Sequence, residues 1–258
     1  MSNIKAEQEK ILGIIRNAKS VFVYTGAGVS KESGLPTFRD DDGVWKQYDP
    51  MTLATAEGFF QDPLMVWNMY RMRQKQVEEA VPNEGHITLA KMEEYYPEFL
   101  IVTQNVDDLH ERAGNKNVVK LHGDIWQVRC TETNEVFDVR YFHLPETLTY
   151  ETLPRGRTGA ICRPNIVWFG EYVPRDAMSK AIEAARKCDL MFIIGTSGEV
   201  SGGYGFAEYA LSNGASIIDI NPNKSHLTDY AHYWFMGPSG VVLPSMWEEV
   251  TGNKQSDD

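Results

Sequence analysis

The sequence predicts an α/β protein in which a parallel sheet carries helices on both faces and a smaller module is inserted beside it. The first observation is a set of apolar runs with the length and composition of buried strands. They occupy residues 20–28, 99–105, 189–197 and 215–221. The second observation is that segments with helical periodicity lie between or before these runs, as at 176–187 and 205–214. Strands that alternate with helices are typical of a parallel sheet.

The N-terminal segment predicts a surface helix that precedes the first strand. Its apolar residues fall on one helical face, and they are Ile4, Ile11, Leu12, Ile14 and Ile15. The segment lacks the continuous apolar stretch of a signal peptide. The tail at 252–258 (GNKQSDD) has the composition of a disordered end.

Two stretches interrupt the alternation of strands and helices. Residues 42–92 are helical in pattern and rich in Met, Trp and Tyr, whereas residues 125–165 hold short alternating pieces between turns rich in Pro and Gly. We interpret both as insertions that build the smaller module (42–92 and 125–165). The remaining ranges, 1–41, 93–124 and 166–258, are then expected to form the larger domain.

Composition excludes several classes of function. With 258 residues, of which 42% are hydrophobic, the chain can bury one large core or two smaller ones. A net charge of -11 argues against a nucleic-acid-binding surface, and no apolar run approaches the ~18 residues of a membrane helix. Three widely spaced cysteines fit a reducing compartment. We therefore expect a cytoplasmic protein with no nucleic-acid or membrane partner; the sequence does not predict its oligomeric state.

Small and polar residues follow each predicted strand, where an open parallel sheet binds its ligand. The first strand runs into Gly26-Ala27-Gly28, which is typical of a phosphate-binding turn. Lys31 stands where the dinucleotide-binding fingerprint has its third glycine, so glycine spacing alone leaves a plain strand-to-helix turn equally open. The continuation, SGLPTFRD, is a turn-rich loop that carries Phe38 and Arg39.

Six motifs together resemble the sirtuins, the NAD-dependent protein deacylases. They are GAGVSKESGLPTFRD (26–40), TQNVDDLHERAG (103–114), LHGD (121–124), RPNIVWFGE (163–171), GTS (195–197) and INPN (220–223). They occur in the family's order, and the resemblance extends from about Ala18 to Pro244. It implies a Rossmann-type NAD-binding domain, a smaller module with a helical part and a zinc-ribbon-like part, and an active site between them.

The resemblance also implies which residues bind NAD and perform the chemistry. His122 is the expected general base, and Asn105 is expected to act beside it. The expected NAD-binding residues are Gly26, Ala27, Gly28, Ser30, Phe38, Arg39, Gln104, Asn105, Asp107, Gly195, Thr196, Ser197, Asn221 and Ser239. The expected residues for an acylated-lysine protein substrate are Ala54, Tyr70, Arg73, Val167, Phe169, Gly170, Glu171 and Val200.

The residue types suit this chemistry. An amide oxygen is a poor nucleophile, so it needs a good leaving group, and the nicotinamide on C1′ of NAD is one. A base must then take a proton from the ribose hydroxyls, so that the 2′-oxygen accepts the acyl group. Histidine suits this task because its ordinary pKa of ~6.5 lies near working pH. A lone histidine in a turn would more often be a packed residue; the six motifs favour the base.

Tyr70 and Arg73 lie three residues apart in a predicted helix, so both can face one side. A Tyr–Arg pair at this spacing resembles the sirtuin class that removes succinyl and malonyl groups, where the arginine binds the distal carboxylate. Ala54 falls where that class has a small residue that opens the pocket. The alternative is an ordinary amphipathic helix with an arginine that faces solvent.

The zinc-binding positions of the family are mostly lost. Sirtuins usually carry two Cys-x-x-Cys pairs that bind zinc tetrahedrally. Here Cys130 matches the first position, but Thr133, Arg155 and Thr158 stand at the other three. We therefore predict that no zinc is bound and that residues 125–165 form a metal-free sheet. Its packing is expected to use Val136, Phe137, Val139, Tyr141 and Phe142.

Two further departures leave other functions open. Asp124 follows His122-Gly123 where the family usually has a small neutral residue, so its carboxylate is expected to raise the pKa of His122 or to repel an acidic acyl group. The family's Val-x-Pro-Ala stretch reads Val200-Ser201-Gly202-Gly203. Protein ADP-ribosylation or NAD hydrolysis at the same site is one alternative. A non-catalytic module that senses NAD or ADP-ribose is the other.

Overall fold

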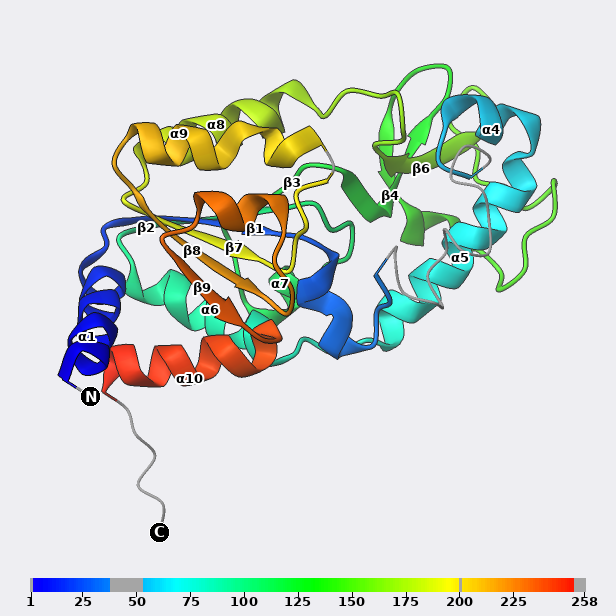
Figure 1. Ribbon diagram of the computed structural model, residues 1–258. Helices are drawn as coiled ribbons and strands as arrows, with labels where there is room; N and C mark the ends of the chain where they lie inside the picture. The colour runs from blue at the N-terminus through cyan, green and yellow to red at the C-terminus, as the bar shows by residue number, and fades with distance from the viewer. Residues whose placement is uncertain (1, 38–52, 200, 253–258) are drawn as a thin grey trace, which may run out of the picture.

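The computed structural model describes residues 2–37, 53–199 and 201–252, and its larger part is a six-stranded parallel sheet (Figure 1). The strand order is β3-β2-β1-β7-β8-β9. The strands are β1 (Ser20–Thr25), β2 (Glu98–Thr103), β3 (Val118–Lys120), β7 (Leu190–Ile194), β8 (Ser216–Asn221) and β9 (Tyr233–Met236). Because the chain order reverses between β1 and β7, a crevice is expected beyond their carboxyl ends.

The four strands expected from apolar runs are all present, but the first three end before their expected last residues, 28, 105 and 197. β1 ends at Thr25, and the glycine-containing segment after it folds into a 3-10 helix, η1 (Ala27–Ser33). The edge strands β3 and β9 were not expected from the sequence. β3 has three half-buried residues and β9 has no fully buried residue, so neither shows a clear apolar run.

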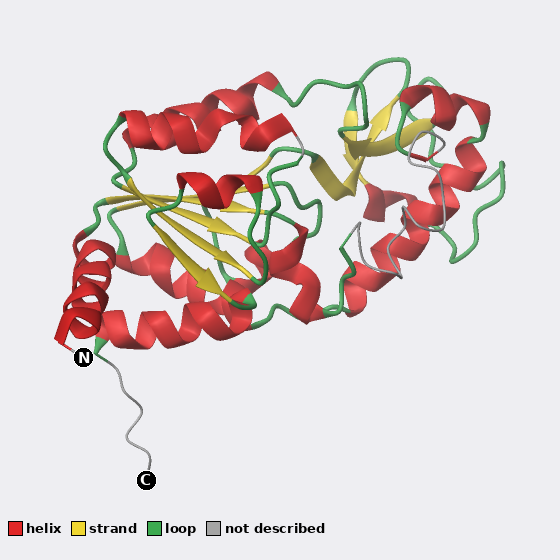
Figure 2. Ribbon diagram, in the orientation of Figure 1, coloured by secondary structure: helices red, strands yellow, loops and turns green. Residues whose placement is uncertain are grey.

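Helices cover both faces of the sheet (Figure 2). On one face lie α8 (Arg175–Lys187) and α9 (Phe206–Ser212), whose apolar residues share a core with Phe22 and Tyr24 of β1. On the other face lie α1 (Ser2–Asn17), α6 (Glu84–Tyr95) and α10 (Ser239–Thr251). Short helices at the loops are α7 (Leu109–Ala113), η3 (Ser201–Gly205) and η4 (His226–Tyr230). This arrangement is the expected α/β fold.

The smaller module lies beyond one end of the sheet and contains a three-stranded antiparallel sheet in the order β5-β4-β6 (Figure 1). Its strands are β4 (Gly123–Cys130), β5 (Val136–Asp138) and β6 (Cys162–Ile166). Its helices are α4 (Ala56–Gln61), α5 (Pro63–Glu79) and the short η2 (Val139–Phe142). A separate apolar core, which includes the fully buried Trp67, joins α5 to the small sheet.

Two expectations about the module need correction. The helix α6, which falls within the range 42–92, packs on α10, and its Leu89 and Met92 belong to the core of the large sheet. In the module core, Val139 is buried and Phe137 and Phe142 are partly buried, with ring centroids 6.0 Å apart. Val136 and Tyr141, by contrast, are 47% and 79% exposed. Val136 points to solvent because only one face of a short antiparallel sheet packs on a core, and Tyr141 lies on the outer side of η2.

Within the described ranges, no helix combines the length and the apolar character that a membrane span requires.

Candidate active site

Close packing at the ends of β1 and β7 explains the two glycines after β1. The amide of Gly26 donates to the carbonyl of Ile194, and the amide of Gly28 donates to that of Gly195 at 2.9 Å. A Cβ on Gly28 would lie only 2.7 Å from the Gly195 oxygen, and one on Gly26 would lie 2.7 Å from Cβ of Thr196. The two amides that we expected at a pyrophosphate are therefore engaged by the neighbouring strand end. Ala27 between them is half-buried.

Three expected NAD-binding residues form one buried network at the carboxyl ends of β1 and β2. The hydroxyl of Ser30 donates to Asp107 at 3.1 Å, and the amide group of Asn105 donates to Ser30 at 3.0 Å. The backbone N–H of Leu109 also donates to Asp107. Burial raises the pKa of Asp107, although these hydrogen bonds oppose the shift. Asn105 and Asp107 are each only 8% exposed. The network therefore fixes the orientation of these buried polar side chains.

The side chain of Gln104 is held at one end, where its Oε1 accepts a hydrogen bond from Thr196 at 2.9 Å. Among the described residues, its buried Nε2 has no partner in good hydrogen-bond geometry, although the buried Tyr24 hydroxyl lies beside the Gln104 side chain. Within the same part of the chain, the buried hydroxyl of Ser239, at the start of α10, has no partner either. Unsatisfied buried donors are costly, so these atoms fit a site that a polar ligand completes. The donors and hydroxyls along this edge suit the amide, ribose and phosphate groups of NAD.

The other expected NAD-binding residues lie along the same edge, or outside the described part. Asn221 at the end of β8 is buried, and its amide group donates to Asp219. Gly195 has a positive φ of 60°, and Thr196 and Ser197 follow it. Phe38, Arg39 and Val200 lie outside the described residues.

His122 precedes β4 and faces the strand ends of the large sheet. Its Nδ1 lies 3.0 Å from the backbone oxygen of Gln104. Because a carbonyl only accepts, Nδ1 carries the proton of the neutral ring and Nε2 is left as the acceptor. Burial lowers the pKa of His122, against a raising effect of the Gln104 carbonyl. The ring is therefore neutral at pH 7 and able to act as a base at Nε2.

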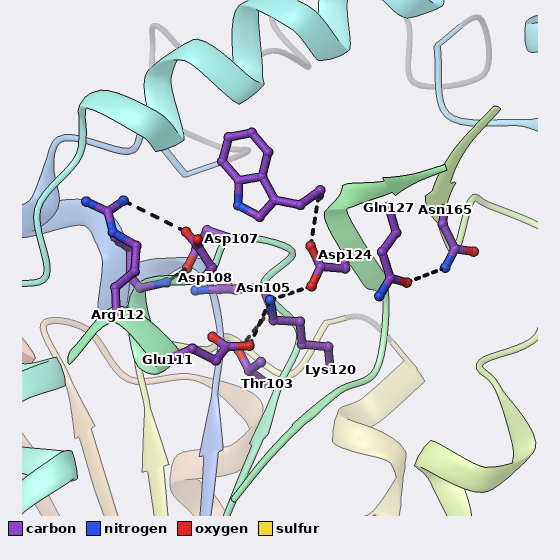
Figure 3. Close-up of polar contacts among 12 residues, drawn as sticks. Thr103, Asn105, Asp107, Asp108, Glu111, Arg112, Lys120, Asp124, Gln127 and Asn165 are labelled. Carbon is purple, nitrogen blue, oxygen red and sulfur yellow. Dashed lines mark hydrogen bonds and ion pairs between the residues drawn. The ribbon is translucent and has the colours of Figure 1, made fainter. Parts of the chain in front are cut away.

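Asp124 does not act on His122 as we expected. Its carboxylate accepts from the ammonium of Lys120 at 2.9 Å (Figure 3), and the backbone N–H of Trp126 donates to it at 2.8 Å. Lys120 also binds Glu111 at 2.9 Å, and its side chain is only 11% exposed. The pKa of His122 is lowered, which is opposite to the effect of a neighbouring carboxylate. Lys120 thus offsets part of the charge of Asp124, because it shares its ammonium with Glu111.

Tyr70 and Arg73 on α5 face the region between the module and the large sheet. Tyr70 is 7% exposed, and its hydroxyl accepts a hydrogen bond from the indole N–H of Trp168 at 2.9 Å. Burial raises the pKa of Tyr70 to about 12. Burial lowers the pKa of Arg73, and the charge of Asp107 opposes the shift. The guanidinium of Arg73 is therefore near both Tyr70 and the Asp107 network.

The segment after β6 reaches across to Ala54 and to His122. The amide of Val167 donates to the carbonyl of His122, and the amide of Phe169 donates to that of the buried Ala54, both at 2.8 Å. The Phe169 side chain is 51% exposed. Gly170 takes a positive φ of 84°, as the turn requires. The segment therefore joins the base, Ala54 and the exposed Phe169 ring.

The carboxylate of Glu171 has a local structural task in this structure. It pairs with both terminal nitrogens of the buried Arg163 and accepts from the backbone N–H of Trp168 at 2.9 Å. The Arg163 guanidinium stacks 3.5 Å from the centroid of the Trp168 ring. These contacts hold Trp168 against Tyr70, so Glu171 supports the substrate-facing segment indirectly.

The zinc-ribbon positions are partly gathered around Cys130. Hydrogen bonds from Thr133, and a weaker one from Thr158, lower the pKa of its thiol. Cys162 faces Cys130 across β4 and β6, and burial raises its pKa to about 12. In the described part of the chain, no three His, Cys, Asp or Glu side chains cluster as metal ligands. Two threonines and an arginine are poor zinc ligands, so the residues present do not fit a structural zinc.

Tyr204 is a site residue that the sequence did not reveal. Its hydroxyl lies 2.7 Å from Nε2 of His122. It follows the glycines of the segment that departs from the sirtuin pattern, and no motif includes it. The sequence pointed to this segment only by its difference from the family's Val-x-Pro-Ala stretch. The spacing of residues does not predict where the side chain of a tyrosine between two glycines points.

Comparison with known proteins gives a consistent result. The model of the Sir2 family matches residues 26–202. An NAD-dependent protein deacylase of Aquifex aeolicus (strain VF5) is 42% identical over 230 residues, which cover 89% of this chain and 94% of that protein. A solved complex of a Sir2 homologue with NAD superposes with a TM-score of 0.86 at 38% identity, covering 95% of this chain and 94% of the other.

A second solved structure contains a peptide as well. It is a Sir2 protein with a deacetylated p53 peptide and 3′-O-acetyl-ADP-ribose, and its TM-score is 0.80 at 26% identity. The alignment covers 94% of this chain and 98% of that one. With a family model that matches more than half of its residues, and with relatives aligned over nearly their whole length, the chain belongs to the Sir2 family, the sirtuins.

Proposed function

We propose that this protein removes acyl groups from lysine side chains of proteins with consumption of NAD, and that it prefers succinyl and malonyl groups. The single observation that carries the proposed reaction is the state of His122. Its Nδ1 proton is held by the Gln104 carbonyl and its pKa is lowered, so that Nε2 is a neutral base at the carboxyl edge of the sheet. The NAD-dependent deacylases among its relatives support the same reaction.

The residues of this edge have distinct tasks in the proposed reaction. When bound, NAD supplies the C1′–nicotinamide bond, which breaks as the acyl oxygen attacks. Gln104 offers its buried Nε2 to the ligand as a donor. The hydrogen bonds among Asn105, Ser30 and Asp107 orient their polar side chains next to Gln104. His122 is then the base for a ribose hydroxyl, whose deprotonation frees the oxygen to accept the acyl group. With one water molecule consumed, the products are free lysine, nicotinamide and O-acyl-ADP-ribose.

The proposed acyl preference depends on Tyr70 and Arg73. A partly buried guanidinium binds a carboxylate more strongly than an exposed one does; that of Arg73 lies near Tyr70 and Asp107 and donates from Nη1 to Gln76. Because the Trp168 indole donates to the Tyr70 oxygen, the hydroxyl proton of Tyr70 remains to be donated elsewhere. Arg73 and Tyr70 thus offer two donors of the kind that a succinyl or malonyl carboxylate requires. Ala54 is small and buried, and it belongs to the same apolar cluster as Tyr70.

The Arg73→Met variant tests this preference, and Arg71→Met is the matched control. Arg71 lies on the same helix, but it donates to the carbonyls of Leu144 and Pro145 and to Gln74. With NAD and matched peptides, Arg73→Met is expected to lower kcat/KM for the succinyl peptide about tenfold to hundredfold, the worth of a hydrogen bond to a charged group. Its activity on the acetyl peptide is expected to stay within about twofold of wild type.

The outcome also separates the other candidate functions. If Arg73→Met and wild type treat both acyl groups alike, the proposed preference is wrong while the proposed deacylation stands. Release of nicotinamide without O-acyl-ADP-ribose would indicate NAD hydrolysis or ADP-ribosylation. Binding of NAD with no release of nicotinamide would indicate a sensor.

A further inference from the structure

The basic nitrogen of His122 is already occupied by a hydroxyl from another element. Tyr204 in η3 lies 2.7 Å from Nε2, and the ring centroids are 6.2 Å apart. Because Nδ1 carries the ring proton, Nε2 is the acceptor and Tyr204 is the donor. A substrate hydroxyl therefore cannot reach the lone pair of Nε2 while Tyr204 holds this position.

Packing holds the Tyr204 ring in place. The centroid of the Tyr204 ring lies 5.7 Å from that of the Phe206 ring. Phe206 is fully buried and packs edge-on against Phe22 and Tyr24. The backbone behind it is also close-packed, since a Cβ on Gly203 would lie 2.9 Å from the side chain of Leu227. These contacts hold one side of the half-buried Tyr204 ring and the backbone that carries it.

The backbone conformation of Tyr204 is itself unusual. Its φ is 60°, in the left-handed region that bulky residues rarely adopt, and it lies between Gly203 and Gly205 at 69° and 73°. Strain of this kind persists where the surrounding structure enforces it, often at functional sites. Here it directs the hydroxyl at the base.

We propose that Tyr204 is a catalytic residue, through which His122 takes the proton of the ribose hydroxyl. The inference rests on the proposed deacylation. A hydroxyl that donates to Nε2 still has lone pairs with which to accept a hydrogen bond from the substrate. As the ribose O–H bond breaks, its proton passes to the Tyr204 oxygen, and the original Tyr204 proton passes to Nε2 of His122. Tyr204 ends neutral, His122 ends as imidazolium, and the ribose oxygen is free to attack the acyl carbon.

The test compares full-length wild type with Tyr204→Phe, His122→Ala and the control Tyr209→Phe. Tyr209 lies on α9 beneath the Arg186 guanidinium and outside the site. Two rates are measured with NAD and a succinyl peptide: exchange of labelled nicotinamide into NAD, and formation of O-acyl-ADP-ribose. The base acts only after nicotinamide has left, so the exchange rate reports binding and the first step.

The relay predicts a split between the two rates. Tyr204→Phe should form O-acyl-ADP-ribose about tenfold to hundredfold more slowly than wild type, as general-base catalysis is weakened. The nicotinamide exchange rate of Tyr204→Phe and its KM for peptide should stay within about twofold of the wild-type values. Both rates of the control Tyr209→Phe should also stay within about twofold of wild type. His122→Ala should show the same split, with a larger loss.

Three results would overturn the relay. Product formation by Tyr204→Phe that equals or exceeds wild type would mean that the hydroxyl only covers the base. An equal fall in both rates would mean that Tyr204 is structural. Wild type that forms no acylated product under any condition would remove the proposed deacylation and the relay together, a failure distinct from the first two.

Discussion

His122 shows at the scale of one residue how the fold makes a base. The Gln104 carbonyl fixes its tautomer, and burial lowers its pKa below the ordinary ~6.5. A histidine in a turn has neither property by virtue of its sequence. The motif LHGD predicted the position of the base, whereas its protonation state follows from β2 ending at Thr103 and presenting the next carbonyl to the ring.

A pH–rate profile tests this state of His122. Neutral His122 is the active form, and its pKa is lowered, so deacylation should be fully active at pH 7 and should fall only below about pH 6.5. Replacement by Ala should lower product formation about 10²-fold to 10⁴-fold. An acid limb centred above pH 7 would contradict the role of burial.

The sequence did not predict the contacts that Tyr204 and Asp124 make. The contact of Tyr204 with His122 joins positions 82 residues apart through an unusual backbone turn. Asp124 was expected to perturb His122, but Lys120 and the Trp126 amide bind its carboxylate. In both cases the missing information was the direction of a side chain, which motifs and spacing do not give.

Among the strands, the antiparallel pairing of β4 with β6 depends on Gly123. Its φ is 90°, and a Cβ there would lie 2.0 Å from the Asn165 oxygen. Gly123→Ala should therefore lower the free energy of unfolding by at least about 3 kcal/mol. Gly159→Ala is the matched control, since its φ is 85° but no atom lies within 4 Å. It should cost only about 1 kcal/mol.

Urea denaturation of the two glycine variants provides the measurement. Gly13→Ala, in α1 and with open space around it, should raise stability by about 0.5–1 kcal/mol and serves as the opposite control. Equal losses in Gly123→Ala and Gly159→Ala would mean that the backbone of β6 yields and that the contact is unimportant.

The small sheet is predicted to hold together without metal. Metal analysis of the purified protein should find well under one zinc per chain, and a chelator should leave its melting temperature unchanged. Because Thr133 and Thr158 already contact the Cys130 thiol, the triple variant Thr133→Cys, Arg155→Cys, Thr158→Cys should bind about one zinc. Stoichiometric zinc in the wild type would refute the metal-free prediction.

The sequence predicted the strands that are almost completely buried and missed the two strands at the edges of the large sheet. β1, β7 and β8 are almost fully buried, so their sequences are continuous apolar runs. The edge strands β3 and β9 lack this signal. The pattern of α6 predicted a helix correctly, but only the packing of Leu89 and Met92 reveals that it covers the large sheet.

At the scale of the whole molecule, stability should depend on pH through a buried histidine pair. His86 and His110 pack with ring centroids 4.9 Å apart, and burial lowers the pKa of His86 to about 4. The folded protein keeps His86 neutral, whereas the unfolded chain takes up a proton below about pH 6.5. Stability is therefore lost as pH falls from about 6.5 to 4.

The size of this effect follows from the lowered pKa. The loss assigned to His86 should be about 3 kcal/mol, and comparing wild type with His86→Phe cancels the titrating groups that do not contact this pair; the pKa of His110 is lowered mainly by its own burial. Urea denaturation at pH 7 and pH 4.5 gives the difference. Parallel losses in both proteins would show that His86 does not contribute.

Mass spectrometry of the products formed from NAD and a panel of acyl-lysine peptides distinguishes deacylation from the other uses of NAD. We expect nicotinamide, deacylated peptide and O-acyl-ADP-ribose, with faster formation from succinyl- and malonyl-lysine than from acetyl-lysine. Consumption of NAD at the same rate with and without peptide, with no O-acyl-ADP-ribose, would contradict the proposed deacylation.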